Sequence, residues 1–130
     1  MRLFVVALFV SMAFVCCDQG PTREELAMLA AEGYYRHLLA AEYDQFLEGS
    51  SRDYAGLPED YREQLRAAVK QFMAQQQALH RGISSVKPVR AVADTLTHSA
   101  NVFLLLCYGD STQEEIVVPM IEQQGHWAMR

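Results

Sequence analysis

The segment Ala100-Asn-Val-Phe-Leu-Leu-Leu-Cys-Tyr108 decides the fold, together with the residues that follow it. After it come the turn Gly-Asp-Ser-Thr at 109–112, the mostly apolar run Gln-Glu-Glu-Ile-Val-Val-Pro-Met-Ile at 113–121, Glu-Gln-Gln-Gly at 122–125 and His-Trp-Ala-Met-Arg at 126–130. Apolar runs of strand length that alternate with Gly-containing polar turns indicate antiparallel strands joined as hairpins. We therefore predict a three-stranded meander over residues 100–130.

The strand predicted at 100–108 is apolar on both of its faces. Leu104 and Leu106 lie on one face, whereas Phe103 and Leu105 lie on the other. A strand of this kind is expected to be covered on both sides. Helices can cover one side. The other side requires a second layer, for which a partner subunit, the curl of the sheet and a ligand are the candidates.

A fourth strand is predicted at residues 86–93, upstream of the meander. Pro88 cannot donate a ladder hydrogen bond, so it places this strand at a sheet edge or at a bulge. The polar residues 94–99 then form the turn into the strand at 100–108. Residues 86–130 thus predict four strands in a mostly antiparallel sheet.

The region before the sheet predicts two helices. Thr22 as N-cap and Glu25 three residues later form a capping box, and helical spacing of apolar residues continues to Leu47. Gly33 inside this helix is expected either to allow close packing of another element or to bend the helix. A second helix is predicted to open at Pro58 and to stop at Gly82.

Length and charge limit the classes of function. A chain of 130 residues forms one domain, and it is long enough to fold without a metal or a disulfide. The net charge of −5 provides no basic footprint, so nucleic acid is excluded as a partner. No Gly-rich phosphate loop occurs, and the four histidines share no metal-ligand spacing. We expect neither a cofactor nor a metal.

The N-terminal segment predicts export. Met1-Arg2 is followed by an uncharged, mostly apolar run at 3–15, which is the architecture of a signal peptide and is short for a permanent membrane span. The run ends at Cys16-Cys17-Asp18, which resembles a bacterial lipobox. We predict a signal peptide at 1–17 with lipidation of Cys17 (Cys16 is the second choice), a tether at 18–21 and a domain at 22–130. The alternative is an ordinary cleaved signal that yields a secreted or periplasmic soluble protein.

Lipidation of Cys17 would leave Cys107 without a disulfide partner. Cys107 lies inside the most apolar predicted strand. A buried, inert thiol is the expected state of a cysteine in such a strand.

The order of these features resembles a known superfamily. The chain resembles the nuclear transport factor 2-like, or cystatin-like, superfamily in three features. They are a helix with Tyr34-Tyr35 and Tyr43-Asp44, a second helix, and four strands ending in Gly-His-Trp-Ala-Met at 125–129. The chain is similar to the small bacterial lipoproteins of unknown function within it. The resemblance implies a cone-shaped α+β fold, with N-terminal helices across the concave side of a curved four-stranded sheet. It also implies dimerisation through the sheet. The residues expected to line the pocket or the core are Tyr35, Leu38, Phe72, Leu104, Leu106 and Trp127.

The sequence favours a binding role over catalysis. We predict a lipoprotein anchored in the bacterial cell envelope that binds a small molecule, a peptide or another envelope protein. The alternative is an isomerase- or cyclase-type enzyme, since some members of the superfamily transfer protons inside the cone. Its catalytic candidates would be Tyr35, Asp94 and His98, and Tyr34 and Tyr108 are further candidates. No motif links these residues, and tyrosines at such spacing are more often part of the core.

Overall fold

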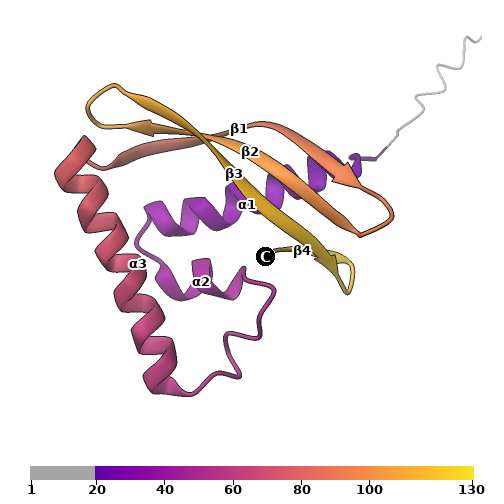
Figure 1. Cartoon of the computed structure of the whole chain (residues 1–130), viewed down its shortest axis with the longest axis horizontal. Coiled ribbons are helices and arrows are strands. Elements are labelled where there is room, and N and C mark those ends of the chain that lie inside the picture. The colour runs from indigo at the N-terminus through magenta and orange to yellow at the C-terminus, as the bar shows by residue number, and fades with distance from the viewer. Residues whose placement is uncertain (1–19) are drawn as a thin grey trace, which may run out of the picture.

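A computed structural model describes residues 20–130, so the predicted signal peptide, Cys16 and Cys17 lie outside the described residues. The described chain is an α+β domain with one four-stranded sheet, as the sequence predicts, and it has three helices where the sequence predicts two (Figure 1). Its elements are α1 (Arg23–Leu39), α2 (Tyr43–Glu48), α3 (Glu59–His80), β1 (Ile83–Asp94), β2 (Ser99–Tyr108), β3 (Gln113–Gln123) and β4 (His126–Met129).

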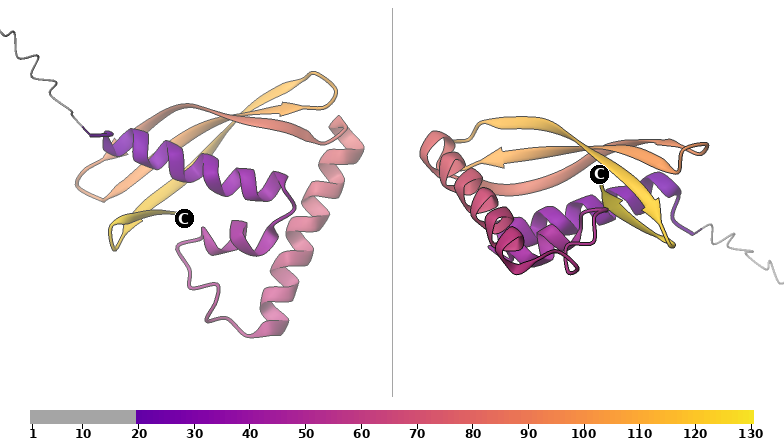
Figure 2. Two further views of the ribbon diagram at one scale, coloured as in Figure 1. Left: turned by 180° about the vertical axis from the view of Figure 1, so that it is seen from behind. Right: turned by 60° about the horizontal axis from the view of Figure 1, so that its bottom comes forward.

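The four strands form an antiparallel meander in the order β1-β2-β3-β4. β1 is an edge strand, and its register against β2 shifts between Pro88 and Arg90. This is the position expected for a proline that cannot donate a ladder hydrogen bond. The sheet is strongly twisted and curved, and α1 lies across its inner face (Figure 2).

The core fills the space between α1 and the inner face of the sheet. Val102 and Leu104 of β2 and Met120 of β3 are fully buried there. Ala27 and Ala31 of α1 are also fully buried, and their small side chains allow the helix to approach the strands closely. No polar or charged residue among 20–130 is fully buried. The interior is therefore formed by the packing of apolar side chains.

The first helix is shorter than predicted. We expected one helix from the Thr22 cap to Leu47, but α1 ends at Leu39 and α2 begins at Tyr43. Ala41 adopts a left-handed φ of 60°, and the Glu42 N–H donates to the His37 carbonyl at 2.9 Å. The chain turns here although no glycine or proline marks the position.

Gly33 serves no close packing. α1 continues through Gly33, and a Cβ placed there would meet no atom within 4 Å. The expectation that this glycine lets another element pack closely is wrong, and the alternative expectation of a bend stays a prediction.

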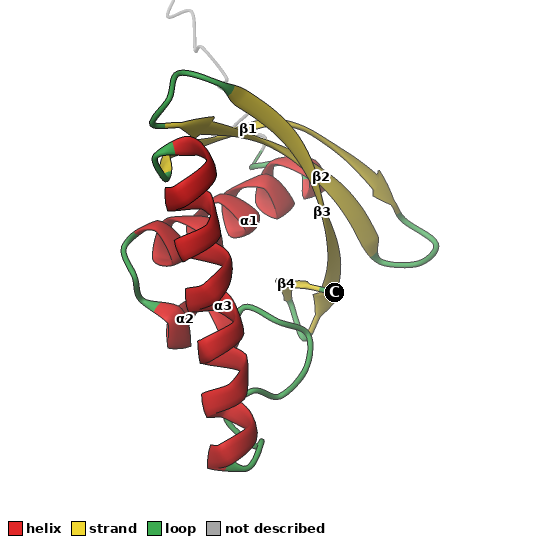
Figure 3. Ribbon diagram, turned by 60° about the vertical axis from the view of Figure 1, so that its left-hand side comes forward, coloured by secondary structure: helices red, strands yellow, loops and turns green. Residues whose placement is uncertain are grey.

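α3 stands away from the sheet and is attached to it at its C-terminal end. Arg81 takes the left-handed conformation with φ 60°, and Gly82 follows with φ 82°. The Gly109 N–H donates to the Gly82 carbonyl at 2.9 Å, and the Asp110 N–H donates to the His80 carbonyl at 3.0 Å. These bonds join the helix end to the β2–β3 turn, while the rest of α3 extends beyond the sheet beside α2 (Figure 3). No residue of α3 is fully buried.

The outer face of the sheet carries no helix of residues 20–130 (Figure 2). Val92 and Val117 on this face are 61% and 51% exposed. Phe103 is half-buried beneath the guanidinium of Arg90, which lies 3.8 Å from the ring centroid. Self-association through this face stays a prediction.

Candidate functional site

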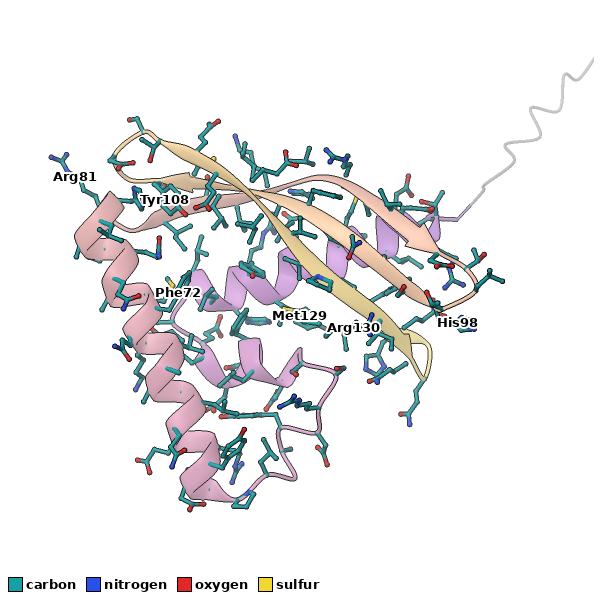
Figure 4. The ribbon with its side chains drawn as sticks, in the orientation of Figure 1. Phe72, Arg81, His98, Tyr108, Met129 and Arg130 are labelled. Carbon is teal, nitrogen blue, oxygen red and sulfur yellow. The ribbon has the colours of Figure 1, made fainter. Side chains whose placement is uncertain are left out.

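A cleft opens between α2, the following loop and the first half of α3. We call it the α2–α3 cleft, and its volume is about 490 Å³. It lies on the side of α2 and α3 that faces the end of β4, near Arg130 (Figure 4). Its lining residues are Leu47, Ser50, Arg52, Tyr54, Leu57, Tyr61, Leu65 and Arg130.

The loop that forms one wall of the cleft is fixed to the end of the sheet. Ser50 makes a parallel bridge with Met129. The Met129 N–H donates to the Gly49 carbonyl at 2.7 Å, and the Ser51 N–H donates to the Met129 carbonyl at 2.6 Å. A Cβ at Gly49 would collide with the ring of Tyr34, so a glycine is required at this approach. Backbone pairing of this kind holds the loop in one conformation.

A buried tyrosine joins this loop to both helices. Tyr54 is 5% exposed, and its hydroxyl donates to the Asp44 carboxylate of α2 at 2.7 Å. Arg66 of α3 donates to the Tyr54 hydroxyl at 3.1 Å, to Asp44 at 3.1 Å and to Glu59 at 2.7 Å. The hydrogen bond from Tyr54, and next those from Arg66, lower the pKa of Asp44. Asp44, Tyr54, Glu59 and Arg66, here called the Tyr54 network, thus tie the loop to α2 and α3.

The lining of the cleft combines apolar walls with positive charge. Leu47, Leu57 and Leu65 supply aliphatic surface from α2, the loop and α3. Arg52 and Arg130 are exposed, and neither forms an ion pair with another residue of 20–130. Two arginines without ion pairs among residues 20–130 therefore line the cleft beside an apolar surface.

A second, more polar depression of about 740 Å³ lies against the same loop. It shares Ser50, Arg52 and Tyr54 with the α2–α3 cleft, and it extends to the β3–β4 turn through Gln123 and His126. The loop is thus exposed to solvent space on two sides, and Arg52 lines both hollows.

Comparison with solved structures identifies the architecture. A protein from Campylobacter jejuni, assigned as an NTF2-like transpeptidase, superimposes with a TM-score of 0.58 at 10% sequence identity. The superposition covers 76% of this chain and 92% of that one. The chain has the nuclear transport factor 2-like fold. No family model matches the sequence, and no curated protein matches it.

The predicted pocket residues divide between a hollow and the core. Tyr35, Leu38 and Phe72 line a small apolar hollow of about 260 Å³ between α1, α2 and α3. Leu104, Leu106 and Trp127 are buried in the core beneath α1 and line none of the hollows described above.

The predicted catalytic candidates are not brought together. His98 lies in the β1–β2 turn with a φ of 50°, and Asp94 uses its carboxylate to accept the Leu96 N–H at 2.9 Å. Tyr35 packs edge-on against Phe46, with ring centroids 5.6 Å apart, and burial raises its pKa. Figure 4 places His98 at one end of the molecule, whereas Phe72, which shares a hollow with Tyr35, lies near the other.

The other two tyrosines considered for catalysis have hydrogen-bond partners. The Tyr34 hydroxyl donates to the Trp127 carbonyl at 2.6 Å, which fixes α1 to β4. The Tyr108 hydroxyl donates to Glu114 at 2.6 Å. Both hydroxyls therefore serve local packing in this nuclear transport factor 2-like domain.

Sequence reasoning missed the α2–α3 cleft. The sequence signal that was available is the polar connector at 49–57, since long connections between helices frequently carry function. The pairing of Asp44 with Arg66 spans 22 residues and leaves no local pattern. Among residues 20–130, no three His, Cys, Asp or Glu side chains gather as a metal site would require. Nor is any helix in this part of the chain long and apolar enough to cross a bilayer.

Proposed function

We propose that this protein is an envelope lipoprotein whose α2–α3 cleft binds an amphipathic anion, that is, an apolar body with an acidic head. The observation that carries the proposal is the pairing of Arg52 and Arg130, free of ion pairs within residues 20–130, with a wall of three leucines.

The chemistry of the lining supports this class of ligand. A guanidinium binds a carboxylate through two parallel hydrogen bonds, and such charge-assisted bonds are stronger than neutral ones. The aliphatic wall from Leu47, Leu57 and Leu65 favours the apolar part of the same ligand. A free fatty acid, or an apolar peptide segment that ends in a carboxylate, has both parts.

The same lining argues for binding without catalysis. The α2–α3 cleft is lined by no aspartate, glutamate, histidine or cysteine. Its serine, Ser50, accepts the Arg52 N–H with its hydroxyl oxygen at 3.3 Å and faces no base in the lining. An activated nucleophile needs a neighbouring base. The likeness to the Campylobacter jejuni protein at 10% identity concerns the fold and does not carry its assigned activity to this chain.

The anchoring part of the proposal rests on the sequence of residues 1–17. Its test is the intact mass and detergent partitioning of the full chain expressed in a bacterium, beside Cys17→Ala. A mass that corresponds to cleavage before Cys17 plus acyl chains, lost in the variant, is expected. Cleavage without added lipid would instead make the protein a secreted soluble domain.

The binding part can be tested with decanoate as the probe and decan-1-ol as a probe of similar shape without charge. NMR titration of the processed protein should shift amide resonances at residues 47–65 and 130. Arg52→Gln should weaken decanoate binding about tenfold, which is the effect of losing one charged hydrogen bond, and should leave decanol binding unchanged. Arg36→Gln, a change of the same type on α1, is the control. Equal affinity for the two probes, or shifts confined to another surface, would contradict the assignment.

A further inference from the structure

The β1–β2 turn projects a leucine into solvent. Leu96 is 91% exposed, more than any other large apolar side chain among residues 20–130. The turn around it is hydrogen-bonded: Leu96 N–H donates to Asp94 at 2.9 Å, and the hydroxyls of Thr97 and Ser99 lie 2.6 Å apart. A leucine held outward by an ordered turn makes little contact with its own chain and is available to an external partner.

This turn lies beside the start of α1. The Glu122 N–H donates to the His98 carbonyl at 2.8 Å, and the Glu122 carboxylate pairs with Arg23 at 3.1 Å. Through Glu122, the β1–β2 turn and the first residue of α1 are therefore neighbours. Figure 1 shows both at one end of the molecule, with α3 at the opposite end.

The same end carries other exposed apolar side chains. Leu26 and Leu29 in the first two turns of α1 are 43% and 61% exposed, and Val92 near the end of β1 is 61% exposed. Positive charge is not in excess here, because Arg23 is paired with Glu122 and α1 begins with Glu24 and Glu25. A partner of this surface is selected by apolar contact and not by attraction to anions.

The position of the chain entry identifies that partner. Cys17 precedes Gly20 by three residues, which span at most about 11 Å when fully extended. If Cys17 carries acyl chains, as the proposed function states, Gly20 is held within that distance of the bilayer surface. α1 begins three residues later, at Arg23. A tether so short gives a weak apolar contact a high effective concentration.

We propose that this end of the domain rests on the membrane, with the Leu96 side chain inserted at the boundary between lipid headgroups and acyl chains. The inference rests on the proposed anchoring through Cys17. The contact orients the domain: α3 and the β2–β3 turn point away from the bilayer. Because the surface lacks unpaired cations, the contact does not depend on anionic lipid.

The test uses the full chain, processed in a bacterium and reconstituted into phosphatidylcholine vesicles. Cys107 is replaced by alanine, and a polarity-sensitive fluorophore is attached through Leu96→Cys. Ser111→Cys in the β2–β3 turn, also exposed and at the other end of β2, is the matched control. The label at 96 should shift to shorter wavelength and be quenched at least threefold more than the label at 111 by nitroxide-bearing lipids. Adding anionic lipid or salt should change neither result.

The outcomes separate the two proposals. Intact mass reports whether Cys17 is acylated; a chain that is processed without lipid contradicts the anchoring and the orientation together. An acylated, vesicle-bound chain whose labels at 96 and 111 are equally quenched overturns the orientation and leaves the anchoring intact. In a second version that carries the fluorophore only at Val92→Cys, Leu96→Ser should reduce quenching. Leu79→Ser should not reduce quenching, because this 70% exposed leucine lies at the C-terminal end of α3, away from the proposed membrane contact.

Discussion

The imidazole of His80 stacks on the phenol ring of Tyr108, with ring centroids 4.3 Å apart and planes inclined by 25°. His80 is the last residue of α3 and Tyr108 is the last residue of β2. The His80 Nδ1 also lies 3.0 Å from the Asp110 carboxylate. Side chains therefore reinforce the backbone bonds that attach α3 to the β2–β3 turn.

This attachment should weaken in acid. Hydrogen bonds from the Thr112 hydroxyl and backbone N–H, followed by the bond with His80, lower the pKa of Asp110 to about 2 from an ordinary value of 3.8. A lowered folded-state pKa gives stability that is present above pH 4 and lost as the pH falls towards 2. Denaturant unfolding measured from pH 5 to pH 2 should show a decline in free energy that Asp110→Asn reduces. Glu63→Gln, which removes an exposed carboxylate from α3, should leave the decline unchanged.

The Tyr108 phenol should ionise late in alkaline titration. Burial, followed by the hydrogen bond to Glu114, raises its pKa to about 12 from 10. A raised folded-state pKa gives stability that is complete below pH 10 and lost between pH 10 and pH 12. The difference between the ultraviolet titrations of the wild type and Tyr108→Phe isolates this group. Glu114→Gln should move its transition to lower pH; a transition unaffected by that change would remove Glu114 as a cause.

Two glycine substitutions should have opposite effects on stability. Gly49→Ala places a methyl group against the ring of Tyr34, and overpacking of this kind costs about 1–3 kcal/mol. Gly33→Ala meets no neighbour inside α1, so it should stabilise the fold by roughly 0.5–1 kcal/mol. Thermal and denaturant unfolding of the pair measures both. Destabilisation by Gly33→Ala would contradict the open space at that position.

The two faces of β2 should respond differently to truncation. Leu104 is fully buried on the inner face, so Leu104→Ala should cost about 2–5 kcal/mol. Phe103 on the outer face is half-buried, and Phe103→Ala should cost less at low protein concentration. Sedimentation of the Phe103→Ala protein beside the wild type then tests self-association through the outer face. A cost of Phe103→Ala that grows with protein concentration would indicate a dimer.

The sequence predicts the sheet well because its strands and two of its three hairpin turns have local markers. The apolar runs fix the strands, Gly109 and Gly125 lie in their turns, and Pro88 lies at the irregularity of the edge strand. The capping box of Thr22 and Glu25 is equally local, and both of its hydrogen bonds form at 3.1 Å. Interactions within a few residues can be read from composition and spacing.

The break between α1 and α2 and the α2–α3 cleft could not be predicted in this way. Ala40 and Ala41 are strong helix formers, so local propensity favours a continuous helix. The Tyr54 network holds α2 against α3 through Asp44 and Arg66, which lie 22 residues apart and leave no local pattern in the sequence. Likewise, Arg52 and Arg130 reach one cleft only through the bridge between Ser50 and Met129.

α3 has no fully buried residue, so we expect the domain to consist of parts that differ in the free energy of local unfolding. We expect β2 to exchange its amide hydrogens only when the apolar interior is disrupted. α3 forms hydrogen bonds at Arg66 and His80 but has no fully buried residue, and we expect it to open by a partial, less costly fluctuation. Since α3 supplies Tyr61 and Leu65 to the cleft, a molecule bound there would slow hydrogen exchange in the helix before it changed exchange in the sheet. Binding in the α2–α3 cleft would thus be detected first as slower local unfolding of α3.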